Sequence, residues 1–157
     1  MGFKRILAAV DFSEGVTEKV VEVASDIARC NNAELFLIYV VEKEIPLMVR
    51  EGLIVPSAET GTIEKIFEKL ESRAMSRLST IATEAEKKYG VKPRPIVETG
   101  EPFDEIIEKA HQLGADLIVV GAHSKSGIER LLLGSVSERV ARKARTSVMI
   151  VRLDDSK

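Results

Sequence analysis

Short apolar runs alternate with amphipathic segments along the whole chain. A continuous apolar run is typical of a strand covered on both faces, whereas apolar residues three or four positions apart indicate a one-sided helix. Their alternation predicts a parallel sheet with helices on both faces. The expected strands are residues 3–10, 33–41, 91–99, 116–120 and 146–152. The expected helices are residues 14–30, 62–89, a segment opened by Pro102 and stopped by Gly114, and a segment from about residue 135.

One segment, residues 42–61, breaks this rhythm. It contains Pro46, Gly52, Pro56 and Gly61, and no hydrophobic period persists through it. At about 20 residues it is longer than most connections between elements. We interpret it as an excursion loop that would serve as a lid or as a partner surface, and the sequence leaves both roles open.

Local signals mark several element ends. Pro93 and Pro95 each lack a backbone donor, so the strand at 91–99 is expected at an edge of the sheet. Ser13 is the expected N-cap of the first helix, and Gly90 is the expected residue just beyond the second. Cys30, at the end of the first helix, is expected to be buried.

Composition narrows the class of protein. A chain of 157 residues with 45% hydrophobic residues is expected to form one domain, here residues 1–157. Its net charge of −2 favours neither a nucleic-acid surface nor a basic membrane patch. No stretch approaches 18 apolar residues, so we expect a soluble cytoplasmic protein and no membrane association. A single cysteine excludes a disulfide within the chain, and with only two histidines we expect no permanent metal site.

The stretch from Gly121 to Ser135, GAHSKSGIERLLLGS, carries the clearest functional signal. It follows the apolar run 117–120 and leads into the last helix. Gly121 lets a backbone approach a ligand, Gly127 lies within the loop, and Gly134 and Ser135 open the helix. Backbone N–H groups at a helix start, with the Ser135 hydroxyl, suit a phosphate. On spacing alone, a glycine-containing connection without a ligand remains an equal alternative.

Three segments resemble the universal stress protein family, and the likeness covers essentially the whole chain. They are KRILAAVDFS at 4–13, the Gly-Glu-Pro turn at 100–102, and LIVVGAHSKSGIERLLLGSV at 117–136. The resemblance implies an open, Rossmann-like five-stranded parallel sheet with strand order 3-2-1-4-5. It also implies homodimers, commonly through the final strand, for which residues 146–152 form an apolar edge candidate.

Nucleotide-binding members of that family show a glycine, two residues, a second glycine, nine residues, and then glycine followed by serine or threonine. Gly121, position 124 and Gly134-Ser135 fit this spacing, but Ser124 replaces the second glycine. If position 124 needs a positive φ, serine costs about 1–2 kcal/mol that glycine avoids. If φ is negative, the hydroxyl could donate to a phosphate. The sequence does not choose between the two.

The resemblance implies a place for Asp11, which closes the first strand, near the adenosine half of a nucleotide, with Ala9 and Val40 beside the base. The alternative for Asp11 is a turn-forming or helix-capping role. Lys125 could meet phosphate charge or be merely solvated. The complete set of expected nucleotide-binding residues is Ala9, Asp11, Val40, Gly121, His123, Ser124, Lys125, Gly127, Gly134, Ser135 and Val136.

These observations favour an ATP-binding stress-response module that works as a homodimeric switch or adaptor. Mg²⁺ or Mn²⁺ could arrive with the nucleotide, held by phosphates and water. One alternative is a weak ATP hydrolase, for which neither a catalytic triad around His123 nor a firm metal site is evident. The other is a family member without nucleotide that acts through protein contacts, which Ser124 keeps open.

Overall fold

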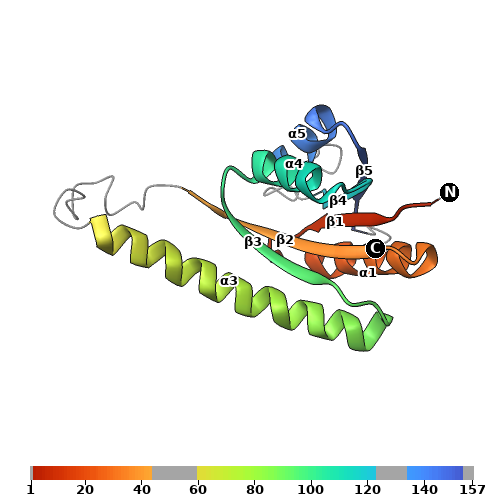
Figure 1. Cartoon of the computed structure of the whole chain (residues 1–157), viewed down its shortest axis with the longest axis horizontal. Coiled ribbons are helices and arrows are strands. Elements are labelled where there is room, and N and C mark those ends of the chain that lie inside the picture. Colours follow the sequence, from red (N-terminus) through yellow and green to blue (C-terminus); the bar gives the residue numbers. More distant parts are fainter. Residues whose placement is uncertain (1, 44–59, 123–133, 154–157) are drawn as a thin grey trace.

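The computed structural model of this protein describes residues 2–43, 60–122 and 134–153. In these residues, strands and helices alternate around one sheet, as predicted (Figure 1). The elements are β1 (Arg5–Ala9), α1 (Val16–Asn31), β2 (Glu34–Glu42), α3 (Thr60–Tyr89), β3 (Arg94–Gly100), α4 (Pro102–Leu113), β4 (Leu117–Gly121), α5 (Ser135–Lys143) and β5 (Ser147–Val151).

The sheet has five parallel strands in the order β3-β2-β1-β4-β5. This is the order 3-2-1-4-5 that was expected. The chain moves outward from β1 to β2 and β3, and then returns to place β4 on the other side of β1. Connections leave β1 and β4 in opposite directions, so a crevice opens at their carboxyl ends, where ligands bind in sheets of this kind.

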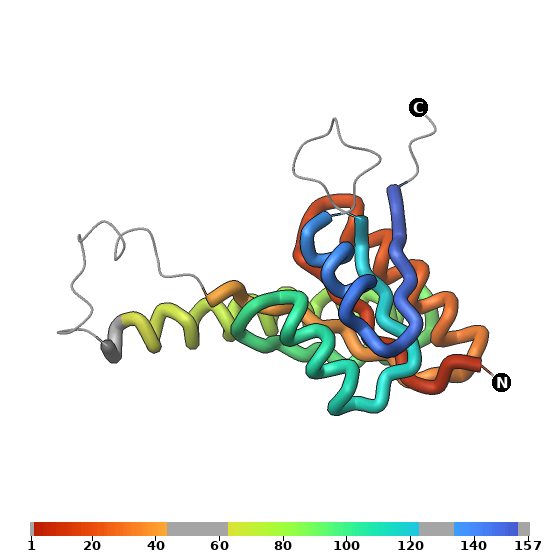
Figure 2. The backbone as a smooth tube through the Cα atoms, turned by 90° about the horizontal axis from the view of Figure 1, so that it is seen from above, coloured from red at the N-terminus to blue at the C-terminus, as the bar shows by residue number. Residues whose placement is uncertain are grey.

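Helices cover both faces of the sheet (Figures 1 and 2). Successive residues of β1 point to opposite faces, as in any strand. Ile6 packs in a cluster with Val20 of α1 and Leu78 of α3. Leu7 belongs to a second cluster with Ile106 of α4 and Val140 of α5. Each face of the sheet therefore has its own apolar core, with α1 and α3 on one side and α4 and α5 on the other.

The predicted element ends are confirmed at β3 and α3 and are wrong at α1. β3 is an outer strand, in agreement with its prolines. Gly90 follows α3 with φ 73°, and its N–H donates to the carbonyl of Glu86 at 3.1 Å. The N-cap of α1 is Gly15, with φ 83°, and not Ser13. Ser13 does not cap the helix because it lies two residues before Gly15, in the turn where its hydroxyl and its N–H both donate to Asp11.

The expected burial of Cys30 is also wrong, since Cys30 is exposed. The buried stripe of α1 runs through Val20, Ala24 and Ala28, and Cys30 lies outside it. β2 continues through Glu42, and α3 begins at Thr60. Most of the predicted excursion loop therefore lies outside the described residues. Among the described residues, no helix combines the length with the apolar character that a membrane crossing requires.

Candidate functional site

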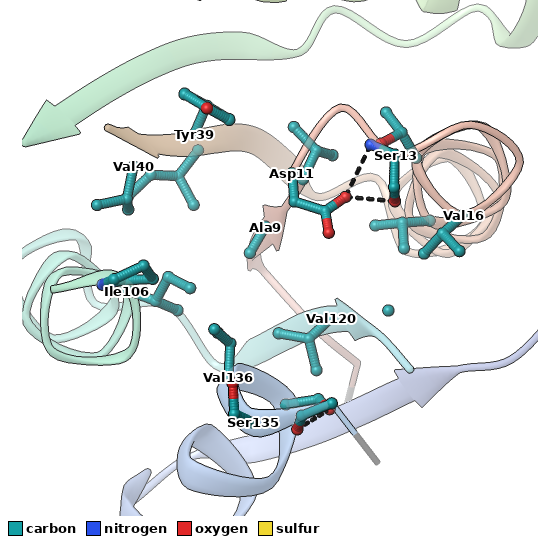
Figure 3. Close-up of a pocket in the computed structure, with 18 of the residues that line it drawn as sticks. Ala9, Asp11, Ser13, Val16, Tyr39, Val40, Ile106, Val120, Ser135 and Val136 are labelled. Carbon is teal, nitrogen blue, oxygen red and sulfur yellow. Dashed lines mark hydrogen bonds between the residues drawn. The ribbon is translucent and has the colours of Figure 1, made fainter. Parts of the chain in front are cut away.

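A cavity of about 710 Å³ lies at the carboxyl ends of β1, β2 and β4, where the strand order reverses (Figure 3). Residues from the first turns of α1, α4 and α5 also line it. Seven of the residues expected from the sequence line it: Ala9, Asp11, Val40, Gly121, Gly134, Ser135 and Val136. His123, Ser124, Lys125 and Gly127 lie outside the described residues. That these residues bind a nucleotide stays a prediction.

One side of the cavity is apolar. Val40 of β2 and Ile106 of α4 are both buried and lie close together in Figure 3, with Ala9 and Val136 at the edge of the same space. Ile38, two residues before Val40, continues this surface toward the core. This side suits the flat, weakly polar face of a ring system.

Asp11 lies across from that apolar side, in the loop after β1. Its Oδ1 accepts hydrogen bonds from the backbone N–H of Ser13, at 2.9 Å, and from the Ser13 hydroxyl. Its carboxylate points into the cavity in Figure 3. Asp11 therefore forms the turn that was considered as its alternative role and also lines the candidate site.

The residue after Asp11 has an unusual backbone. Phe12 has φ 64°, in the left-handed region that side chains rarely occupy. Its ring stacks on Tyr39, which lines the cavity, and the guanidinium of Arg77 lies 4.4 Å from the ring centroid. Arg77 also donates to the carbonyl of Phe12 at 3.5 Å. These contacts from β2 and α3 hold the loop that carries Asp11.

Tyr39 is electrostatically coupled to the cavity. Burial raises the pKa of the Tyr39 phenol above its ordinary value of 10.0. The negative charges of Glu42 and Asp11 raise this pKa further, and the charge of Arg77 lowers it. The charges of both carboxylates therefore affect the same residue, Tyr39, which lines the cavity.

Opposite this wall, the N-terminus of α5 faces the cavity. Gly134 is its N-cap, and no side chain caps the helix. The Gly134 carbonyl accepts from the Ser137 hydroxyl at 2.9 Å and from the Glu138 N–H at 3.0 Å. The Ser135 side chain is exposed and lines the cavity. The first N–H groups of a helix have no partners within it, so this end carries partial positive charge suited to an anion.

Gly121 is required by packing. A Cβ at this position would collide with Cγ1 of Val16 and would lie 3.2 Å from Cγ2 of Val20. The glycine therefore lets the end of β4 lie directly against the first turns of α1. Close packing against α1 therefore explains this glycine, in addition to the approach to a ligand that was expected from the sequence.

Five polar lining residues were not expected at the site from the sequence: Ser13, Thr17, Tyr39, Glu42 and Ser137. Glu42 directly follows the predicted strand 33–41, so the strand-end argument used for Asp11 would have found it. Thr17 is 5% exposed, and within the described residues its hydroxyl has no hydrogen-bond partner. No sequence signal marks this threonine.

Charge is unevenly distributed around the cavity. Among the lining residues that the structure describes, Asp11 and Glu42 are the charged ones, and none is basic. The described part of the chain also holds no group of three or more His, Cys, Asp or Glu residues placed to bind a metal ion. This part of the wall suits hydrogen-bond donors of a ligand. The start of α5 suits its anionic groups.

A sequence model of the universal stress protein family matches residues 2–152. Universal stress protein MJ0531 of Methanocaldococcus jannaschii is 36% identical over 150 residues, covering 96% of this chain and 82% of that protein. Universal stress protein MJ0577 of the same organism is 31% identical over 160 aligned residues, covering 98% of each chain.

Solved structures show the same fold. A structure of MJ0577 has a TM-score of 0.79 at 28% identity, with 99% of both chains covered. A universal stress protein in complex with cAMP has a TM-score of 0.65 at 24% identity, covering 98% of this chain and 100% of that one. The universal stress protein from Archaeoglobus fulgidus in complex with dAMP has a TM-score of 0.56 at 21% identity, covering 96% of this chain and 98% of that one. The last two likenesses show the fold alone. From the family match and the relatives together, this chain belongs to the universal stress protein family.

Proposed function

We propose that this protein binds an adenine nucleotide, ATP in the first place, in the cavity at the carboxyl ends of β1, β2 and β4. In this proposal it acts as a regulatory module of the stress response, not as an efficient enzyme. The observation that carries it is the convergence of Asp11, Val40 and Ser135, from three separate parts of the chain, on one cavity. Its volume of about 710 Å³ is in the range of small-molecule sites.

The adenine ring would occupy the apolar side. Val40 and Ile106 offer buried apolar surface there, and Ala9 leaves room because its side chain is small. The complexes of two proteins of this fold with cAMP and dAMP support an adenine-containing ligand. Both of those ligands combine an adenine with a single phosphate group.

The sugar would lie next to Asp11. A carboxylate only accepts hydrogen bonds, and a ribose hydroxyl can donate one. The two hydrogen bonds from Ser13 fix the carboxylate before a ligand arrives, which reduces the entropy lost on binding.

The phosphates would lie at the start of α5. Asp11 and Glu42 repel phosphate, so the anionic end of the ligand is directed away from them and toward Ser135 and the free N–H groups of the first turn. His123, Ser124, Lys125 and Gly127 remain predicted contributors from the loop before Gly134. Mg²⁺ or Mn²⁺ would enter with the phosphates, and the chain's own residues would bind and orient the nucleotide.

Calorimetric titration with ATP and Mg²⁺ tests the proposal, together with a search for nucleotide that copurifies. Ser135→Ala should weaken ATP binding about three- to tenfold, because it removes one hydroxyl donor to phosphate. Ser147→Ala is the matched control, since Ser147 begins β5 at the opposite end of the sheet. No copurifying nucleotide and no heat at millimolar ATP would overturn the proposal and favour a role through protein contacts alone.

The departure at position 124 has its own test. If serine occupies a backbone conformation that favours glycine, Ser124→Gly should bind ATP more tightly than the natural chain. If the serine hydroxyl donates to phosphate, the same variant should bind ATP more weakly. Equal affinity would indicate that position 124 does not contribute to binding.

We further propose that two copies pair through β5. It is an outer strand of the described sheet, and a sheet edge is a template for another strand. Gly121, in the cavity wall, pairs with Val151 of β5, and Ala122 donates to the Val151 carbonyl at 2.8 Å. A ligand that shifts the end of β4 would thereby act on the pairing edge. Light scattering should find a dimer, and Met149→Lys in β5 should weaken it. Met75→Lys, on α3, is the control and should leave the dimer intact. A monomer for the natural chain would contradict the pairing.

A further inference from the structure

We propose that Glu42 selects the base of the nucleotide. Its carboxylate accepts a hydrogen bond from the exocyclic amino group of adenine, so the site prefers a 6-amino purine to a 6-oxo purine. This inference rests on the proposed nucleotide binding and adds a specificity residue to it.

The position of Glu42 follows from the alternation of side chains along β2. Ile38 and Val40 both point to the face that α4 covers, and both line the cavity. Glu42 is the next residue on that face and also lines the cavity, so it continues the apolar row with a carboxylate. A ring that packs on Val40 therefore has one edge directed toward Glu42.

The end of β2 is held firmly enough to position this side chain. Glu42 pairs with Gly100 in the sheet, and the N–H of Lys43 donates to the Gly100 carbonyl at 3.4 Å. Pro102, which starts α4 two residues after Gly100, also lines the cavity. The Glu42 carboxylate therefore lies on a strand end and not on a free loop.

The charges around the cavity favour different positions for the base and for the anionic end of the ligand. Asp11 follows β1 and Glu42 ends β2, and both charges raise the pKa of Tyr39. Asp11 is already engaged by two donors of Ser13. Glu42 is exposed and can accept from a ligand, while the anionic end of that ligand is directed to α5.

The chemistry of the base then decides the preference. The amino group of adenine donates two hydrogen bonds, whereas hypoxanthine carries a carbonyl oxygen at the same ring position. A carboxylate has no proton to give at neutral pH, so this oxygen would face it without a hydrogen bond. Sites that hydrogen-bond a substrate group discriminate strongly against analogues that lack it.

The test compares the affinities of ATP and inosine triphosphate (ITP) by calorimetry in the natural chain and in Glu42→Gln. The natural chain should bind ATP at least about tenfold more tightly than ITP. The glutamine amide can donate to the 6-oxo group, so Glu42→Gln should reduce this ratio about tenfold, mainly by tighter ITP binding. Glu42→Ala should lose the preference without that gain.

Glu101→Gln is the matched control. Glu101 is an exposed carboxylate next to Pro102, paired with Arg139 at 3.6 Å, and its substitution changes the net charge by the same amount. It should leave the ATP-to-ITP ratio unchanged. An unaltered ratio in Glu42→Gln, with ATP still bound, would overturn the role of Glu42 alone. Failure of the natural chain to bind ATP would overturn the proposed function and this inference with it.

Discussion

The ring of Phe12 stacks on the ring of Tyr39, with centroids 4.1 Å apart and planes inclined by 17°. This contact joins the loop after β1 to the strand β2. It matters because Phe12 has φ 64°, a conformation that costs a residue with a side chain roughly 1–2 kcal/mol. The stacking and the guanidinium of Arg77, 4.4 Å from the ring centroid, offset that cost. The backbone turn that presents Asp11 to the cavity therefore depends on aromatic contacts.

Phe12→Ala should lower the free energy of unfolding by about 2–3 kcal/mol, because it removes the stacking and keeps the strained φ. Phe12→Gly loses the same contacts but adopts a positive φ without strain, so it should be about 1 kcal/mol more stable than Phe12→Ala. Urea unfolding of both variants measures which of the two is more stable. Phe12→Gly less stable than Phe12→Ala would contradict the role of backbone strain.

The regular part of this fold could be predicted because its cause is local. The apolar runs of buried strands and the spacing of the helices are visible in sequence, and the family likeness added the strand order. Asp11 was expected at this edge because it closes the first strand, and Gly134 and Ser135 were expected because they open the last helix.

The missed features depend on contacts between distant segments. The conformation of Phe12 rests on Tyr39 and Arg77, which are far away in sequence. Ser13 is not the N-cap because the turn that it forms with Asp11 delays the start of α1 to Val16. Glu42 was missed by one position. The predicted strand ended at Val41, the last apolar residue, whereas the hydrogen-bonded strand β2 continues to Glu42.

Gly121→Ala should lower the free energy of unfolding by about 1–3 kcal/mol, because the added methyl group collides with Val16. Val16→Ala makes room for that methyl group, so the two substitutions should not be additive. The double variant should be more stable than the sum of the single effects by about 1 kcal/mol or more. Additive effects in urea unfolding would show that the collision is not the cause.

Thr17→Val should raise the free energy of unfolding by about 1 kcal/mol. Within the described residues the Thr17 hydroxyl is buried without a hydrogen-bond partner, and valine replaces it with a methyl group of similar shape. Thr146→Val is the control, because the Thr146 hydroxyl donates to the carbonyl of Ala115 at 3.1 Å and its loss should destabilise the protein. Destabilisation by Thr17→Val would show that the hydroxyl is satisfied in solution.

Stability should fall at alkaline pH partly through Tyr39. Burial, with the charges of Glu42 and Asp11, raises the pKa of this phenol above 10.0 in the folded protein. As the pH rises through about 10, the unfolded chain loses the phenolic proton while the folded chain keeps it. The unfolded state then binds fewer protons, so the free energy of unfolding decreases with pH. Below that range the phenol is neutral in both states and contributes no pH dependence.

Tyr39→Phe removes this contribution and retains the stacked ring. The difference in unfolding free energy between Tyr39→Phe and the natural chain should be constant up to about pH 9 and should increase in favour of phenylalanine above about pH 10. Other alkaline titrations occur in both proteins and largely cancel in the difference. The tyrosinate absorbance of Tyr39, obtained by subtracting the Tyr39→Phe titration, should move to lower pH in Glu42→Gln, because one of the charges that raise this pKa is gone. A difference that stays flat above pH 10, or a titration that Glu42→Gln leaves in place, would contradict the coupling between Tyr39 and the cavity carboxylates.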